Sequence, residues 1–223
     1  AYRLAVKPRD FTKGIYKFKS TPVGIIPTDE DLLYALKLGV RTTSMLPQLH
    51  LSDVEMRAVV EYIKTFSDRF SKEKPEQVIE VPPAPPRIMN LVENGKRLFN
   101  VACSACHGKE GKGDGPAVPN LIDYEGRPIK PADLTVRPLK RGNSPEWLYK
   151  IISAGIDGTP MPSFKDAFKP EEIWSIVFYL ESIVKERRGT LKKRGMMMGM
   201  MHEMFVGEEF EGMRIDMEAA RAW

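Results

Sequence analysis

The chain is 223 residues long, which suits one large domain or two small ones with a real hydrophobic core. Hydrophobic residues make up 42% of it and charged residues 29%, which excludes a wholly disordered chain. The net charge of +4 is too small to indicate a nucleic-acid-binding protein by itself. No apolar run approaches the roughly 18 residues needed to cross a bilayer, so no transmembrane segment is expected.

The first 80 residues carry the signals of short helices. Three acidic residues follow Thr28, a pattern typical of a helix N-terminus, and Ser52 forms a capping box with Glu55. The sequence therefore predicts one helix beginning at Thr28 and another over Ser52–Phe66. Met45 lies in the turn-like segment between them.

A proline-rich segment, Val81–Pro86, follows this first helical region. Four of its last five residues are proline, which favours extended polyproline II geometry and ends any helix. We interpret it as a stiff linker between a first domain, residues 1–80, and a second domain, residues 87–187. Residues 188–223 form a tail of different composition.

The second domain repeats the pattern of the first. Helix-start signals recur at Ser144 and Lys169, and Met161 again lies beside proline between the two. No stretch shows the alternation expected of a strand, so we predict a duplicated all-α fold. The matching segments are 8–12 with 131–135, 28–34 with 144–149, 43–47 with 159–162, and 52–66 with 169–184.

The run Cys103-Ser104-Ala105-Cys106-His107 is the sharpest chemical signal. Its spacing is what c-type haem attachment requires, because two thiols about one helical turn apart can each bond one vinyl group of the same porphyrin. The adjacent imidazole can then bind the iron. A dithiol redox pair and a structural zinc site are the alternatives, but the sequence lacks the βαβ pattern of the first and the additional Cys/His pair of the second.

Around this motif the second domain resembles a class I cytochrome c over nearly its whole length. Gly95 and Phe99 lie four residues apart on the predicted helix before the motif, where that family packs its first helix against its last. Tyr179 lies on the predicted last helix, as an aromatic residue does in the family. Residues 108–116 resemble the glycine-rich loop that surrounds the haem edge, where glycine permits positive φ angles and close approach.

The resemblance also implies the axial ligands of the iron. Met161 is expected as the sixth ligand, since a thioether favours Fe(II) and raises the reduction potential relative to a second imidazole. A backbone carbonyl near Pro116 or Pro119 is expected to accept a hydrogen bond from His107. Met161 as simple core filler is the alternative. The aromatic residues of the last helix are interpreted as core: Trp174, Phe178 and Tyr179.

The first domain has the later parts of this pattern but no Cys-x-x-Cys-His. Proteins that resemble this one are typically di-haem cytochromes, and the chain starts at Ala1 without a leader-like sequence, so we expect a removed leader or an incomplete N-terminus. Under one interpretation an upstream segment or a partner supplies the motif, and Met45 binds a second haem, although Thr42 replaces an expected glycine. Under the other, this domain has lost its haem and serves assembly. His50 is interpreted as a surface residue.

The tail combines a basic stretch, a methionine-rich run and an acidic stretch. We expect it to contact another subunit, because methionine-rich segments are adaptable contact surfaces and the tail alone cannot form a core. A Cu(I) site of thioethers with His202, a disordered segment and a membrane-surface helix are the alternatives.

The sequence thus predicts a c-type cytochrome with haem c bound by Cys103, Cys106, His107 and Met161. We expect it to transfer single electrons rather than act as an enzyme, within a larger respiratory or oxidoreductase complex, with redox partner proteins and no nucleic acid. A structural or docking subunit, and a haem enzyme with an open sixth position, are the alternatives. The resemblance implies a periplasmic or otherwise exported protein, and any association with a membrane is expected to be made through partner subunits.

Overall fold

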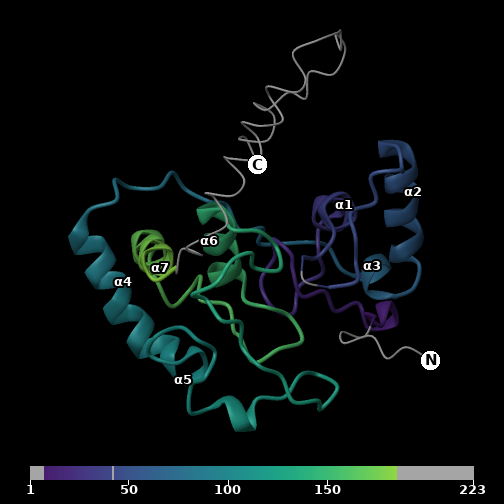
Figure 1. Cartoon of the computed structure of the whole chain (residues 1–223). Helices are drawn as coiled ribbons and strands as arrows, with labels where there is room; N and C mark the ends of the chain where they lie inside the picture. The colour runs from purple at the N-terminus through teal and green to yellow at the C-terminus, as the bar shows by residue number, and fades with distance from the viewer. Residues whose placement is uncertain (1–7, 42, 185–223) are drawn as a thin grey trace, which may run out of the picture. The chain divides into compact units, whose positions relative to one another are not determined.

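The computed structural model of the chain describes residues 8–41 and 43–184, and all of these belong to one compact unit (Figure 1). Within those ranges no strand is formed, and the nearest feature is a single bridge between Ile122 and Pro128. The all-α fold class is therefore confirmed. The described α-helices are α1 (Asp29–Leu38), α2 (Asp53–Lys64), α3 (Arg69–Lys72), α4 (Met89–Ala102), α5 (Ser104–His107), α6 (Pro145–Ala154) and α7 (Pro170–Ser182).

Short 3-10 helices span Phe11–Lys13 and Val118–Asn120. None of the helices in residues 8–41 and 43–184 is both long and apolar enough to span a bilayer. Thr42, the tail at residues 188–223 and His202 within it lie outside the described residues.

The helices begin where their capping residues predict. The Thr28 hydroxyl accepts a hydrogen bond from Asp31 N at 3.1 Å, and the Asp31 carboxylate accepts one from Thr28 N at 3.0 Å. The same reciprocal pair forms at the start of α2 between Ser52 and Glu55. Each reciprocal pair of hydrogen bonds satisfies backbone N–H groups that have no partner inside the helix. Both predicted helix starts are therefore confirmed. The predicted helix over Ser52–Phe66 is slightly shorter in the structure.

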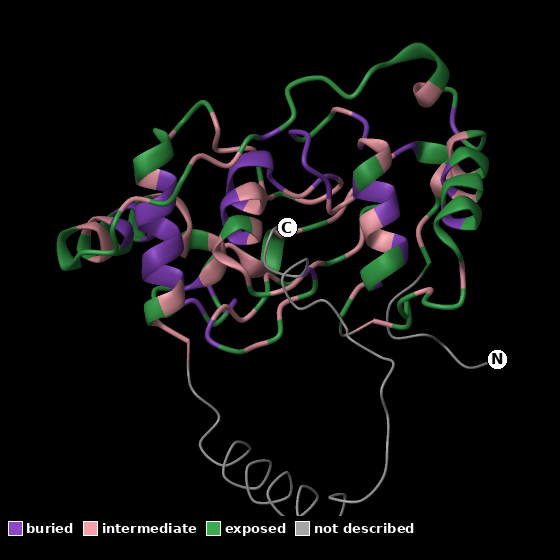
Figure 2. Cartoon of the chain, turned by 90° about the horizontal axis from the view of Figure 1, so that it is seen from above, coloured by how far each residue is buried: buried purple, intermediate pink, exposed green. Residues whose placement is uncertain are grey.

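The two predicted domains are called here the first repeat, residues 8–80, and the second repeat, residues 87–184. Helix α7 is the centre of the second repeat and is buried over most of its length (Figure 2). It packs along α4, and α6 contacts it as well (Figure 1). A Cβ atom on Gly95 of α4 would overlap the carbonyl oxygen of Ser175, so only glycine allows the two helices to cross this closely. Phe99 packs on Tyr179 with ring centroids 5.3 Å apart. This is the packing that the resemblance implied.

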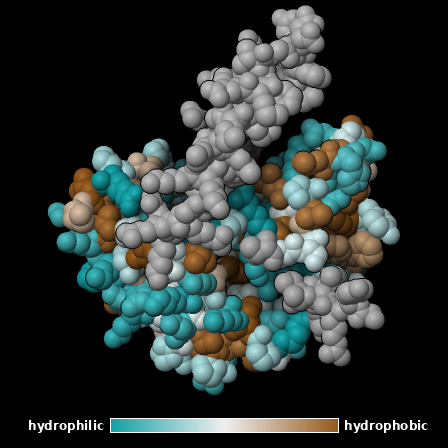
Figure 3. Space-filling model, in the orientation of Figure 1, coloured by the Kyte–Doolittle hydropathy of each residue, from teal (hydrophilic) through white to brown (hydrophobic). Residues whose placement is uncertain are grey.

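The first repeat has a smaller core, formed where α1 packs on one side of α2. The opposite side of α2 is exposed: Val54 and Tyr62 are among the large side chains that reach the surface there. Figure 3 accordingly shows hydrophobic residues at the surface over α1 and α2. The buried members of this core are Tyr16, Leu32, Leu33, Leu36, Met56 and Val60.

Contacts across the boundary between the repeats hold them together. Trp147 of α6 donates from Nε1 to the hydroxyl of Tyr34 on α1 at 2.8 Å, and the guanidinium of Arg141 lies over both rings, 4.5 Å from Tyr34 and 5.0 Å from Trp147. The proline-rich segment is also held, since Pro82 accepts a hydrogen bond from Trp174 Nε1 at 3.1 Å. The two repeats therefore meet along a directional seam of rings and hydrogen bonds.

Candidate haem site

The two cysteines and His107 lie on one helical turn. Cys103 caps α4 and precedes α5, and the N–H groups of Cys106 and His107 both donate to its carbonyl oxygen, at 3.2 and 2.9 Å. Both thiols are free and half-buried. Burial, with a smaller contribution from Cys106, raises the pKa of the Cys103 thiol to about 11. Because thiol–disulfide exchange needs an accessible thiolate, this environment disfavours the dithiol alternative.

The His107 side chain is half-buried, and its buried Nδ1 atom makes no hydrogen bond within the described part of the chain. Burial lowers the pKa of the imidazole, while the nearby backbone carbonyl of Ala132 raises it by less. The neutral imidazole is the form that can bind a metal. The expected hydrogen bond from His107 Nδ1 to a carbonyl near Pro116 or Pro119 is therefore not formed among the described residues, and the backbone of Ala132 is the group that acts on the pKa of the ring.

The reason for this difference lies in the loop that follows α5. Gly113 donates to the His107 carbonyl at 2.8 Å, and Leu134 donates to the Gly111 carbonyl at 2.7 Å. A Cβ atom on Gly113, which has φ +72°, would overlap the carbonyl oxygen of Pro131. The segment around Pro131 is thus drawn against the glycine-rich loop and takes the place beside the imidazole.

Met161 lies in a separate loop that hydrogen bonds hold in a defined shape. The Met161 carbonyl accepts from Ile156 N at 3.1 Å, and Met161 N donates to the Thr159 hydroxyl at 3.2 Å. That hydroxyl in turn donates to the Ile156 carbonyl at 2.7 Å. The Met161 side chain is half-buried, and no hydrogen bond or ring contact among residues 8–41 and 43–184 joins it to His107.

The Met45 loop has the same hydrogen bonds. Its carbonyl accepts from Val40 N at 2.9 Å, its N–H donates to the Thr43 hydroxyl at 3.2 Å, and that hydroxyl donates to the Val40 carbonyl at 2.6 Å. The Met45 side chain is 39% exposed, and His50 nearby is exposed as well. The first repeat therefore retains the methionine loop, although residues 1–223 contain only the cysteine pair of the second.

The donor set of the second repeat fits a haem c. Such a haem requires two thiols one turn apart, an imidazole and a methionine, and the second repeat has all of these: half-buried thiols, an imidazole with a buried and unpartnered nitrogen, and a methionine in a fixed loop. A zinc site fits less well, because no group of three or more His, Cys, Asp or Glu side chains gathers anywhere in the described ranges.

Sequence reasoning missed the polar contacts that hold the Met161 loop from the first repeat. Lys19 and Asp157 form a buried ion pair, with Nζ 3.4 Å from Oδ2. The two residues lie in different repeats, and neither belongs to a recognisable motif. Lys19 lies in a segment without helix signals, so the sequence gave no indication that it pairs with Asp157.

Comparison with known proteins agrees with this site. The family model for cytochrome c matches residues 92–183. The chain is also similar to one in the solved structure of the Kuenenia stuttgartiensis reducing HAO-like protein complex Kustc0457/Kustc0458, with 38% identity and a TM-score of 0.78. That similarity covers 82% of this chain and 84% of the other. No curated protein matches the chain. The chain belongs to the c-type cytochrome family, whose members transfer electrons through covalently bound haem c.

Proposed function

We propose that this chain carries single electrons through a haem c attached at Cys103 and Cys106, with His107 and Met161 as the axial ligands. The observation that carries the proposal is that a single helical turn presents both thiols together with an imidazole whose buried Nδ1 has no described hydrogen-bond partner. The fixed shape of the Met161 loop supports the sixth ligand.

The haem supplies an iron that cycles between Fe(II) and Fe(III). The protein fixes the redox properties of that iron through its own residues. Burial of its ring lowers the pKa of His107 and so favours the neutral imidazole, and Met161 offers a soft, uncharged donor that favours Fe(II). If His107 and Met161 both bind the iron, substrates and dioxygen would have no open site on it, which favours electron transfer over catalysis.

Optical spectra of the holoprotein test the ligand set. Reduced-minus-oxidised spectra should show a c-type haem, and carbon monoxide should bind slowly at neutral pH because Met161 occupies the sixth position. Met161→Ala should bind carbon monoxide rapidly, while Met89→Ala, which removes an exposed methionine from the start of α4, should behave like the native protein. Rapid binding to the native protein would contradict Met161 ligation.

The Met45 loop extends the proposal to a second haem. Its hydrogen bonds match those of the Met161 loop, which supports Met45 as an axial ligand wherever another segment or subunit supplies a Cys-x-x-Cys-His motif. The alternative is a first repeat that holds no haem and serves assembly. Pyridine haemochrome content and the intact mass of the assembled protein distinguish one haem from two.

We also propose that the chain works as a subunit of a larger respiratory or oxidoreductase complex outside the cytoplasmic membrane. The similar solved chain is part of a complex with two named components, which supports a partner subunit here. The first repeat and the tail are the proposed contact regions, and redox proteins are the proposed electron partners. Cell fractionation and purification of the native assembly through this chain test the location and the association.

A further inference from the structure

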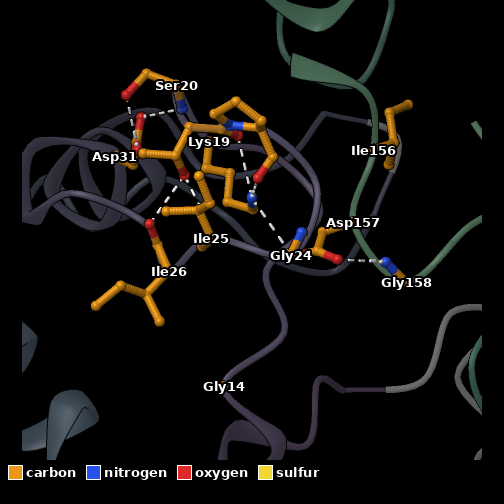
Figure 4. Close-up of polar contacts among 12 residues, drawn as sticks. Gly14, Lys19, Ser20, Gly24, Ile25, Ile26, Asp31, Ile156, Asp157 and Gly158 are labelled. Atoms are coloured by element: carbon orange, nitrogen blue, oxygen red, sulfur yellow. Dashed lines mark hydrogen bonds and ion pairs between the residues drawn. The ribbon is translucent and has the colours of Figure 1, made fainter. Parts of the chain in front are cut away.

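The side chain of Lys19 is buried at the boundary between the two repeats, with only 2% of it exposed. Its ammonium group donates to the carbonyl oxygen of Thr21 at 3.0 Å, and it also contacts the carbonyl oxygen of Pro22 (Figure 4). Its only carboxylate partner in the described ranges is Asp157, at 3.4 Å. A buried ammonium is costly unless hydrogen bonds and an opposite charge satisfy it, and Lys19 has both.

Asp157 lies four residues before Met161 and links two parts of the chain. One carboxylate oxygen accepts from Gly158 N at 3.0 Å, and the other accepts from Gly24 N at 3.4 Å and pairs with Lys19 (Figure 4). Close by, Val23 N donates to the Ala154 carbonyl at 2.9 Å. The segment that leads into the methionine loop is therefore held by charge and backbone contacts from the first repeat.

Gly158, the residue after Asp157, is also closely surrounded by other parts of the chain. It has φ +73°, and a Cβ atom there would lie 3.0 Å from the Ile15 side chain and 2.8 Å from the Tyr124 ring. Tyr124 N also donates to the Gly158 carbonyl at 3.2 Å. Residues 154–158 are thus fixed between the first repeat and the loop that carries Tyr124, immediately before Thr159 begins the methionine loop.

The matching position in the first repeat lacks this arrangement. Arg41 stands where the second repeat has Asp157, and it is exposed. The two methionine loops share their internal hydrogen bonds, yet among the described residues only the Met161 loop has a buried ion pair at its entry. The ion pair is therefore specific to the loop that precedes the proposed sixth ligand.

We propose that Lys19 is a positioning residue for Met161: its ion pair with Asp157 holds the entry of the loop so that the methionine sulfur stays at the sixth position of the haem iron. This inference rests on the proposed function, because it takes Met161 to be that ligand. Without the lysine, Asp157 would be a buried carboxylate without its cation, and outward movement of residues 157–161 would relieve that cost.

Binding of imidazole to the Fe(III) holoprotein measures this effect. Imidazole can bind only where Met161 has left the iron, so its apparent Kd falls as the fraction of open loop rises. We expect Lys19→Met to lower the apparent Kd about tenfold and to lower the reduction potential, since the sulfur favours Fe(II). Lys19→Arg should recover most of the native behaviour, because it retains the charge.

Lys37→Met is the matched control, because Lys37 also pairs with an aspartate, Asp53 at 2.9 Å, but both side chains are exposed and distant in sequence from the Met161 loop. It should leave the imidazole Kd and the potential at native values. An equal change in Lys37→Met and Lys19→Met would overturn the proposal, because the effect would then be general. If Lys19→Met does not fold, Asp157→Asn takes its place, because it removes the charge of the ion pair with little change of shape. It should also lower the apparent Kd of imidazole, and a native Kd would overturn the proposal.

The proposed function and this inference fail in different ways. If Met161→Ala leaves the Fe(III) spectrum and imidazole binding unchanged, Met161 is not the ligand and the proposed function itself is wrong. If Met161→Ala abolishes the spectral signature of sulfur ligation while Lys19→Met and Asp157→Asn bind imidazole like the native protein, only the positioning role of Lys19 is wrong.

Discussion

The two repeats differ most at the helices that follow their methionine loops. Tyr62 of α2 and Tyr179 of α7 occupy matching positions, yet Tyr62 is 65% exposed and Tyr179 only 6%. The methionine loops themselves agree closely in their hydrogen bonds. The shape of the loop is therefore a local property of its own turn residues, whereas burial of the following helix depends on a separate helix, α4, that packs on α7.

The largest effect is expected from removing the two matching tyrosine side chains. Tyr179→Ala should destabilise the holoprotein by about 3–5 kcal/mol, because it opens a cavity between α4 and α7. Tyr62→Ala should cost less than about 0.5 kcal/mol, since that ring lies at the surface. Denaturant unfolding of both variants measures the difference. Equal losses would show that the two helices are similarly covered in solution.

The helix crossing at Gly95 gives a somewhat smaller effect. Gly95→Ala should destabilise the protein by about 2–3 kcal/mol, because the added methyl group meets the Ser175 backbone and the helices must separate. On α2, Ala58 occupies the position of Ser175 and is exposed, so Ala58→Leu should change the unfolding free energy by less than about 0.5 kcal/mol. A tolerated Gly95→Ala would mean that α4 and α7 are not closely packed.

The methionine loops should respond alike to loss of their threonine hydroxyls. Thr159→Val and Thr43→Val each remove hydrogen bonds of the same geometry, so each should cost about 1 kcal/mol in thermal unfolding. Only Thr159→Val should also lower the reduction potential of the haem proposed at Cys103 and Cys106. A loss confined to one loop would contradict the view that the loop shape is local.

The smallest expected effect is a pH dependence at the start of α2. Hydrogen bonds from Ser52, the backbone N–H first, lower the pKa of the Glu55 carboxyl below its ordinary value of 4.5. A carboxylate with a lowered pKa stabilises the folded state above that ordinary value, and this contribution is lost as the pH falls through the lowered value. Glu55→Gln should therefore flatten the acid side of the stability profile. An unchanged profile would mean that this capping box adds no charge-dependent stability.

Local signals predicted the helix starts and the attachment motif because their chemistry lies within a few residues. Thr28 and Ser52 cap the helices that follow them, and the cysteines and His107 share one turn. The close crossing of α4 on α7 followed from the family pattern of Gly95. The number of haems and the sixth ligand stay predictions.

Two features were out of reach of the sequence for the same physical reason. The backbone of Ala132 affects the pKa of the imidazole because the glycine-rich loop holds a distant segment against the turn that carries His107. Lys19 and Asp157 meet only because two repeats pack together, and their side chains lie in segments with no periodic pattern. Contacts between segments far apart in sequence produce no regular residue spacing, so they cannot be predicted from the sequence pattern.

The seam of Tyr34, Arg141 and Trp147 has a consequence for electron flow between the repeats. Hydrogen bonds and ring contacts resist sliding and rotation more than a smooth apolar surface does, because their energy depends on direction. If the Met45 loop receives its own redox centre, these contacts would oppose any movement of the two repeats that changed its distance from the haem proposed at His107.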